Sequence, residues 1–396
     1  MNIPESALQT DRAGPLSGLT VIDLTRVLAG PYATMILADL GARVVKVEVP
    51  ERGDDSRHFG PFINGKSGYF MSMNRGKESI ALDLKADDDR LIFEALLDKA
   101  DIVAENFRPG TMEKLGYGWD ALHARWPQLI YAAMSGFGHT GPYSKRAAYD
   151  LVAQAMGGVM SVTGHPGSPP TKAGSSIGDV CAGMFGSVGI LAAVNERYVT
   201  GQGTKVDVAM LDSQVAILEN HVIRYFSSGQ VPGPIGNRHP SITPFESFAC
   251  ADGSFIAAAG NDALFRTMCE AIGRADLAVD KRFLTNDVRT EHQSALKKEL
   301  EETFLPHGVD HWLAVFEDVG VPSGPINTVD KVVTDPQVLA RKMIIETDDP
   351  IAGRVQMAGN PVKISGYDDP RERSAAPELD ADRDQILFDF GIHKKA

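Results

Sequence analysis

Apolar runs alternate with segments of helical periodicity through the first half of the chain. The run "LTVIDL" at 19–24 leads through the turn "TRVLAGP" into a helical segment that ends near Gly41, and a second apolar run, "ARVVKVEV", follows at 42–49. A strand, a crossover helix and a second strand in this order are typical of a βαβ unit with parallel strands.

The same alternation continues to about residue 228. We predict further strands at 79–85, 101–107, 128–137 and 204–210, and helices at 86–100, 149–161, 178–195 and 211–228. Strands that alternate with helices in this way favour an α/β fold with a doubly wound, Rossmann-like sheet.

The pattern changes after residue 228. The stretch "GQVPGPIGNRHPSITP" is rich in proline and glycine and marks a boundary. Beyond it we predict a strand at 253–260 and helices at about 262–273, 290–304 and 309–319, and then a second link, "GVPSGPIN", at 320–327. We therefore expect a large domain at 1–228, a smaller α+β domain at 229–327, and a C-terminal segment at 328–396 that returns to the large domain.

Composition narrows the classes of partner. The 396 residues carry a net charge of −13, which argues against nucleic acid or an anionic membrane as the main partner. The first fourteen residues are polar and no uninterrupted apolar run reaches a membrane-spanning length, so we predict neither a secretory signal nor a membrane span. Cys181, Cys250 and Cys269 have no pairing or metal-ligand spacing, which predicts free thiols in a reducing cytoplasm and no metal site.

Two windows are basic within this acidic chain. Residues 41–77 hold seven Lys or Arg against four Asp or Glu, and residues 106–146 hold five against two. Basic patches at sheet ends suit a phosphorylated ligand, although scattered surface charge gives the same count. The turn "TRVLAGP" lacks the Gly-x-Gly-x-x-Gly spacing of a nicotinamide dinucleotide site, so it is either an ordinary turn or a place where backbone N–H groups receive another ligand.

Asp179 is the only charged residue at the start of the apolar segment that runs from "SSIGDVCAG" into "MFGSVGILAAV". Asp commonly caps a helix N-terminus, which is the structural interpretation. The same setting would favour the ionised carboxylate, and an ionised carboxylate in an apolar site can act as a covalent nucleophile. Glycines on both sides, at 178, 183, 186 and 189, allow a backbone or ligand to approach closely. Tyr149 and Asp150 begin a predicted helix and are donor and acceptor candidates, or a second cap.

Five stretches together carry a resemblance to a known family. They are "VIDLTRVLAGPYATMILADLGARVVKVEVPERGDDSR", "NRGKESIALDLK", "VAENFRPGTMEKLGY", "YDLVAQAMGG" and "SIGDVCAGMFGSVGILAA". In order and spacing they resemble the class III CoA-transferases, a family that includes the α-methylacyl-CoA racemases. The resemblance implies a Rossmann-like large domain, a smaller second domain, and a homodimer of interlocked rings.

The resemblance also implies roles for individual residues. Asp179 would be the nucleophile, and Tyr149, Asp150 and Gly178 would line the reacting centre. Coenzyme A or acyl-CoA would bind as a substrate, with no permanently bound cofactor. The implied CoA contacts are Val27, Leu28, Ala29, Leu82, Asp83, Lys85, Asn106, Phe107, Arg108 and Lys114.

The implied reaction moves CoA from an acyl-CoA such as succinyl-CoA to a carboxylic acid, through an aspartyl anhydride and an aspartyl-CoA thioester. Racemases of this family have a His at the position of Tyr149, and because Tyr is a poor proton shuttle at neutral pH the transferase is favoured. A racemase or a CoA-binding protein without turnover stays an alternative. The sequence also lacks the usual C-terminal element of the family and has "PELDADRDQ" instead.

The acceptor implied by the resemblance is a dicarboxylate. The family's formyl-CoA:oxalate transferases have a run of glycines over the active site, where this chain has "GPIGNRHPSITPFESF". Arg238 and His239 could bind the distal carboxylate, since a bidentate Arg suits that group. Gly236 and Asn237 belong to the same candidate loop, which could equally be a boundary loop with solvated charges.

Overall fold

The computed structural model describes residues 13–392 and divides into two units. Within the described residues, the larger unit contains 13–159, Lys172–Ser227 and 336–392. The smaller unit contains Met160–Thr171 and Ser228–Asp335. Compared with the expected segment 229–327, the smaller unit therefore also includes 160–171, Ser228 and 328–335.

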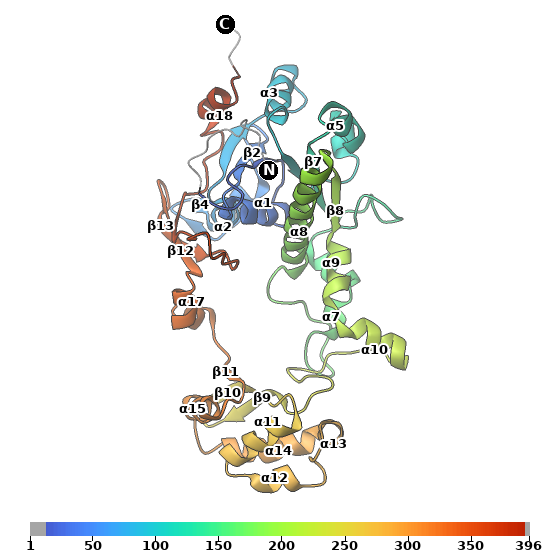
Figure 1. The fold of residues 1–396 in the computed structure, drawn as a ribbon, viewed down its shortest axis with the longest axis vertical. Helices are drawn as coiled ribbons and strands as arrows, with labels where there is room; N and C mark the ends of the chain where they lie inside the picture. Colours follow the sequence, from blue (N-terminus) through green and yellow to red (C-terminus); the bar gives the residue numbers. More distant parts are fainter. Residues whose placement is uncertain (1–12, 393–396) are drawn as a thin grey trace. The chain divides into compact units, whose positions relative to one another are not determined.

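A six-stranded sheet in the order β5-β2-β1-β6-β7-β8 forms the centre of the larger unit (Figure 1). All five strand pairs are parallel, and Val21 of β1 lies between Val44 of β2 and Ile102 of β6. The chain runs outward from β1 to one edge and then returns to build the other half, so the predicted doubly wound α/β fold is confirmed. The strands are β1 (Thr20–Asp23), β2 (Arg43–Glu48), β5 (Glu78–Ala81), β6 (Ile102–Glu105), β7 (Ile130–Ser135) and β8 (Lys205–Ala209).

Both faces of this sheet are covered, which explains why its strands are apolar without strict alternation. One face packs against α1 (Ala29–Asp39) and α8 (Ile177–Thr200), through residues such as Val21, Leu37 and Ile190. The other face packs against four shorter helices, through residues such as Ile22 and Phe93. These helices are α3 (Asp87–Leu97), α4 (Thr111–Leu115), α5 (Trp119–Arg125) and α18 (Arg383–Asp389).

Helix α8 lies against α1 and the sheet because its glycines leave no side chain between them. A Cβ atom on Gly183 would lie 2.7 Å from the carbonyl oxygen of Ala29, and one on Gly189 would lie 2.6 Å from Val206. Within the described residues, α8 is the one helix long and apolar enough to cross a membrane. Half of its most apolar stretch is buried in the larger unit.

Three predicted helices are each two helices in the structure. The segment predicted at 149–161 breaks at Gly157 and Gly158 into α6 (Asp150–Met156) and α7 (Val159–Val162). The segment at 211–228 breaks at Glu219, which has φ +56°, into α9 (Met210–Ile217) and α10 (Asn220–Ser228). The segment at 290–304 lies across α13 (Asn286–Glu291) and α14 (Gln293–Phe304).

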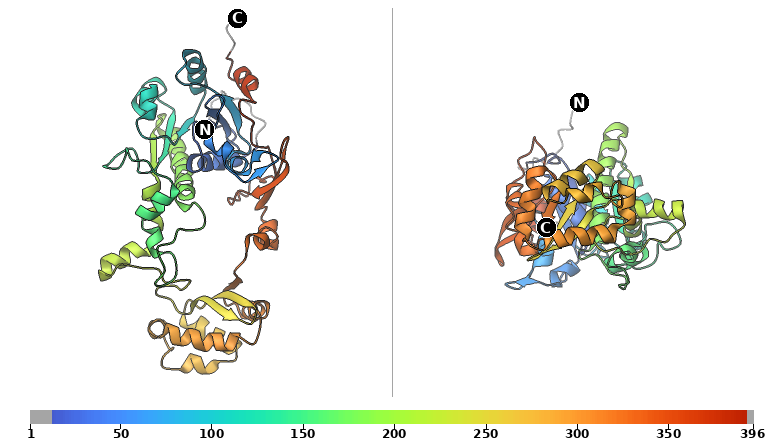
Figure 2. Two further views of the ribbon diagram at one scale, coloured as in Figure 1. Left: turned by 180° about the vertical axis from the view of Figure 1, so that it is seen from behind. Right: turned by 90° about the horizontal axis from the view of Figure 1, so that it is seen from below.

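The smaller unit has its own antiparallel sheet and core. The strands β9 (Phe245–Cys250), β10 (Gly253–Ala258) and β11 (Ser323–Pro325) pair in the order β11-β10-β9. Phe248 and Phe255 pack with Phe304 and Trp312 in one aromatic core. Figure 2 shows the helices of this unit in yellow and orange; besides α13 and α14 they are α11 (Asp262–Ala271), α12 (Ala275–Val279) and α15 (Val309–Val319).

The remaining elements lie at the edges of these cores. The region after β2 contains a short 3-10 helix (Asp55–His58), β3 (Phe62–Ile63), β4 (Lys66–Ser67) and α2 (Gly68–Asn74). The strands β12 (Ile344–Asp349), β13 (Gly353–Ala358) and β14 (Glu372–Arg373) form a small sheet near the C-terminus. Two short helices precede it, α16 (Val329–Val332) and α17 (Pro336–Ala340).

Candidate active site

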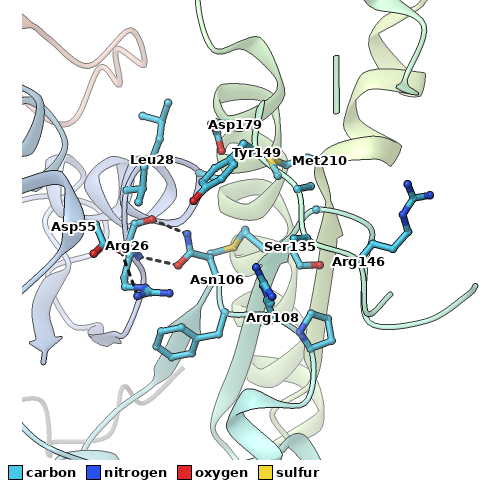
Figure 3. A pocket seen from close by; sticks show the side chains of 18 residues that line it. Arg26, Leu28, Asp55, Asn106, Arg108, Ser135, Arg146, Tyr149, Asp179 and Met210 are labelled. Atoms are coloured by element: carbon cyan, nitrogen blue, oxygen red, sulfur yellow. Dashed lines mark hydrogen bonds and ion pairs between the residues drawn. The ribbon is translucent and has the colours of Figure 1, made fainter. Parts of the chain in front are cut away.

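A cavity of about 220 Å³ lies in the larger unit at the carboxyl ends of β1 and β6. These are the neighbouring strands between which the strand order reverses, and ligands of doubly wound sheets bind at that point. The turn after β1, the turn after β6, the loop after β7 and the start of α8 all contribute side chains (Figure 3). Of the predicted site residues, the cavity brings together Val27, Leu28, Ala29, Asn106, Phe107, Arg108, Tyr149 and Asp179.

The turn that joins β1 to α1 has an unusual backbone. Val27 has φ +66°, which for a β-branched residue is a strained conformation of order 1–3 kcal/mol. Asn106, at the end of β6, accepts the Arg26 N–H (2.8 Å) and donates its amide to the Arg26 carbonyl (2.7 Å), as Figure 3 shows. The polar atoms of Asn106 thus hold the backbone of this turn, and its contact with CoA stays a prediction.

Asp179 does not cap helix α8, so the structural interpretation of this residue was wrong. The helix begins at Ile177, its N-cap is Ser176, and Asp179 lies in the first turn. Asp150 provides a carboxylate at that end instead, because its Oδ1 accepts the N–H of Gly178 at 2.8 Å. A Cβ atom on Gly178 would lie 2.9 Å from the same oxygen, which explains the glycine.

A neighbouring amide fixes Asp150 in turn. Gln154 donates its side-chain N–H to Asp150 Oδ2 (2.7 Å) and accepts the N–H of Ala173 (2.9 Å). Asp150, the first residue of α6, therefore links the start of that helix to the first turn of α8. The sequence analysis assigned no role to Gln154.

Asp179 is also not held in the ionised form that the sequence predicted. Burial and, next, the negative charge of Asp150 raise the pKa of Asp179, a hydrogen bond from the Ala29 backbone N–H lowers it, and together they leave it at about 7. Desolvation and a second carboxylate together outweigh the amide. At neutral pH the carboxyl group is therefore poised between its two protonation states, as is common for catalytic groups.

Two tyrosines belong to this environment. Tyr149 lines the cavity with 78% of its side chain exposed, and Figure 3 shows it next to Asp179. Tyr69, on α2, was missed by the sequence analysis. Burial raises its pKa to about 12, and the charges of Asp179, Asp54 and Asp150 contribute, so its hydroxyl lies in the field of three carboxylates and stays protonated. Tyr69 is recognised as part of the site only from its neighbours in space, and no local sequence motif marks it.

The cavity also contains three arginines. Arg26 pairs with Asp55 (3.4 Å) and lies over the ring of Phe107, while no ion pair is recorded for Arg108 or Arg146 among the described residues. In Figure 3, Arg146 extends away from Asp179, whereas Arg108 points into the group of labelled side chains. Three guanidinium groups against the carboxylates of Asp55 and Asp179 favour an anionic ligand.

Four of the predicted CoA contacts lie outside this cavity. Leu82 is buried in the core, so its side chain is not available to a ligand. Asp83 and Lys85 are exposed in the loop between β5 and α3, and Lys114 is exposed on α4. Their contacts with CoA stay predictions.

The candidate acceptor loop belongs to the smaller unit. Within it, Asn237 donates to Ser247 Oγ (3.1 Å), and His239 accepts from the Ser241 N–H (3.2 Å) and packs against Phe245. Gly236 has φ +71° and donates its N–H to Gly164. Arg238 is half-buried, and no ion pair is recorded for it within residues 13–392. The carboxylate-binding role of this loop stays a prediction.

The cysteines of the described residues lie apart from one another in the sequence. Cys181, Cys250 and Cys269 are all buried and free. Within residues 13–392, no group of three or more His, Cys, Asp or Glu side chains is placed to hold a metal ion.

Comparison with known proteins decides the family. The sequence profile of CoA-transferase family III matches residues 16–383. The chain belongs to CoA-transferase family III. The resemblance inferred from the five sequence stretches is confirmed, and this CoA-transferase is an enzyme of that family.

Its relatives agree along almost the whole chain. The protein is 48% identical to the acetyl-CoA:oxalate CoA-transferase of Acetobacter aceti, over 93% of each chain. It is 41% identical to the succinyl-CoA:mesaconate CoA-transferase of Haloarcula hispanica, over 96% of this chain and 97% of the other. A solved CAIB/BAIF family protein from Brucella suis is 40% identical, with a TM-score of 0.83 over 95% of this chain and 99% of that one.

Proposed function

We propose that this CoA-transferase moves CoA from a short acyl-CoA to a dicarboxylic acid, with Asp179 as the covalent nucleophile. The observation that carries the proposal is the position of the Asp179 carboxylate. It lies in the cavity at the strand-order reversal, together with Arg26 and Arg108. The arginines suit the phosphates of CoA, and the carboxylate is placed to meet the thioester end.

The chemistry uses only exchange of acyl bonds. A carboxylate oxygen of Asp179 attacks the thioester carbon, the C–S bond breaks, and CoA leaves as the thiolate with a mixed anhydride left on the enzyme. The thiolate attacks the aspartyl carbonyl carbon, which gives an aspartyl-CoA thioester and frees the donor acid. The acceptor carboxylate then attacks that thioester, the C–S bond breaks, and CoA thiolate and a second mixed anhydride result. The thiolate attacks the acceptor's acyl carbon, which forms the new acyl-CoA and releases the Asp179 carboxylate.

The environment of Asp179 suits these steps. Only the ionised form attacks, and with a pKa of about 7 a large fraction of the enzyme is ionised at neutral pH. A carboxylate with a raised pKa is also a stronger nucleophile than an exposed one, because it is less well solvated. Partial burial limits the access of water, which would hydrolyse either intermediate.

The relatives support a dicarboxylate acceptor, since they are named as CoA-transferases that act on oxalate, mesaconate and glutarate. The donors in those names are acetyl-CoA and succinyl-CoA, and we propose the same two for this enzyme. We also propose a homodimer, as the resemblance implies. Helix α10 buries none of its residues and exposes Ile223 and Phe226, which supports a partner surface there. The cytoplasm stays the expected compartment.

The test is a matrix of both donors against oxalate, mesaconate, succinate and glutarate, with butyrate as a monocarboxylate control and acyl-CoA products read by mass spectrometry. We expect new dicarboxyl-CoA thioesters from the wild type and none from Asp179→Ala. Normal turnover by folded Asp179→Ala would remove Asp179 as the nucleophile. Transfer to butyrate alone would remove the dicarboxylate assignment.

A further inference from the structure

The turn after β1 is held by side chains from two other elements. The Val27 N–H donates to Asp54 Oδ1 (3.1 Å), and the Arg26 N–H and carbonyl both bond to Asn106. Asp54 is 1% exposed, and its other oxygen pairs with Lys46 (2.9 Å). Lys46 is fully buried and donates to the carbonyl of Thr25 (2.7 Å), so it supports the same turn.

This turn carries the donor that acts on Asp179. Val27 is followed by Leu28, the N-cap of α1, and by Ala29, which lines the same cavity as Asp179 and whose backbone N–H lowers the pKa of that carboxyl by hydrogen bonding. A β-branched residue with φ +66° does not keep that conformation unless its surroundings impose it. The direction of the Ala29 N–H therefore depends on the contacts that fix Arg26 and Val27.

We propose that Asp54 and Asn106 are positioning residues of the transfer reaction, which hold the strained Val27 turn so that the Ala29 N–H meets the Asp179 carboxylate. The inference rests on the proposed function of Asp179. It assigns Asn106 a role through the backbone and gives Asp54, which no motif singled out, a role in the reaction. Burial alone would raise the pKa of Asp54, but Lys46 and the amides of Ser56 and Val27 hold it well below its usual range, so Asp54 stays ionised and the anchor persists.

Loss of the contacts that Asp54 or Asn106 makes with the turn should raise the pKa of Asp179. A hydrogen bond to a charged acceptor is strong enough that its loss raises the acceptor's pKa by about one pH unit. The other charged and titratable groups around Asp179 remain in these variants. They are Asp150 on α6, Tyr149 at its N-cap, Tyr69 on α2, Cys181 on α8, and Arg26, Asp55, Arg108 and Arg146 in the cavity.

The experiment measures the protonation of Asp179 directly. A water-soluble carbodiimide modifies the protonated carboxyl, and peptide mass spectrometry gives the modified fraction of Asp179 between pH 5 and 9. We expect Asn106→Ala and Asp54→Asn each to move the midpoint up by about one pH unit, with the acid limb of kcat moving in the same direction. Glycine adopts positive φ without strain, so a turn with Val27→Gly depends less on its anchoring side chains. Adding Asp54→Asn to Val27→Gly should therefore move the labelling midpoint of Asp179 less than Asp54→Asn moves it in the wild type.

Asp349 provides a matched control. It is also a buried aspartate that accepts two backbone N–H groups, those of Ile351 and Ala352 (both 2.9 Å), and pairs with a buried lysine, Lys66. Asp349→Asn should lose stability and leave the labelling midpoint of Asp179 unchanged. Asn106 is partly exposed, so its variant tests the proposal even if Asp54→Asn does not fold.

The outcomes separate the two claims. An unchanged midpoint in folded Asn106→Ala or Asp54→Asn overturns the positioning roles, as does an equal shift in Asp349→Asn. A wild type that labels with the expected shifts but transfers no CoA overturns the proposed function and leaves the positioning of the Ala29 amide supported.

Discussion

Replacing the Asp179 carboxylate should stabilise the folded protein while it abolishes transfer. The fold raises the pKa of Asp179 from its ordinary 3.8 to about 7, mainly through burial and the charge of Asp150. A raised carboxyl pKa means that the ionised form is disfavoured in the folded state, so the penalty is fully present above pH 7 and absent below about pH 4. At about 1.4 kcal/mol per pH unit, the ionised carboxylate costs up to about 4 kcal/mol at pH 8.

Asp179→Asn removes that charge at nearly constant volume. We expect its free energy of unfolding to exceed that of the wild type by roughly 2–4 kcal/mol at pH 8, with the difference shrinking as the pH falls from 7 to 4. Urea denaturation at fixed protein concentration, repeated at pH 8, 6 and 4.5, measures it. The exposed Asp212 on α9 provides the control, since Asp212→Asn should change stability by no more than about 0.5 kcal/mol. A variant at Asp179 that is no more stable than the wild type at pH 8 would refute the electrostatic reasoning.

Four further predictions follow from the site. Asp150→Asn keeps an acceptor for the Gly178 N–H but removes a charge that raises the pKa of Asp179, so the acid limb of kcat should move to lower pH; an unchanged limb would remove Asp150 as its cause. Gly183→Ala puts a Cβ against the Ala29 carbonyl and should cost about 1–3 kcal/mol, whereas Gly186→Ala meets the flexible Met134 and should be nearly neutral; thermal melts that rank the pair the other way would contradict the packing of α1 on α8. Arg238→Ala should weaken dicarboxylate acceptors more than butyrate, and equal loss in steady-state kinetics would exclude Arg238 from the acceptor site. Incubation with a chiral 2-methylacyl-CoA in deuterated water should give no deuterium uptake, and uptake at the α-carbon would favour the racemase alternative.

The doubly wound α/β class of the central sheet could be predicted from sequence because each βαβ unit shows a local pattern of apolar runs and helical segments. Apolar runs separated by helical periods specified all six parallel strands, and the doubly wound order follows from their connections. Other elements were not predicted. Strand β9 is as long as β2, but its sequence FESFAC contains no apolar run, and helix α2 has only seven residues. The breaks at Gly158 and Glu219 depend on positive φ angles, which tertiary contacts select.

The candidate site divides in the same way. The stretches around Val27, Asn106, Tyr149 and Asp179 pointed to the cavity because they lie where the chain leaves β1 and β6, or where it enters α6 and α8. The chemical state of Asp179 was predicted wrongly. The sequence around Asp179 shows only that helix amides lie near it. The residues that bury its carboxyl group, and Asp150, are distant from it in the sequence. The roles of Asp54, Lys46 and Gln154 are likewise visible only once side chains from separate elements converge.

The covalent state of Asp179 during turnover tests the account most directly. The enzyme would be incubated with succinyl-CoA or acetyl-CoA, quenched with hydroxylamine, and digested for peptide mass spectrometry. We predict a hydroxamate on Asp179 that requires the acyl-CoA and is absent when the free acid alone is supplied. An actively transferring enzyme whose Asp179 peptide stays unmodified, under conditions in which a control thioester is trapped, would contradict the covalent route.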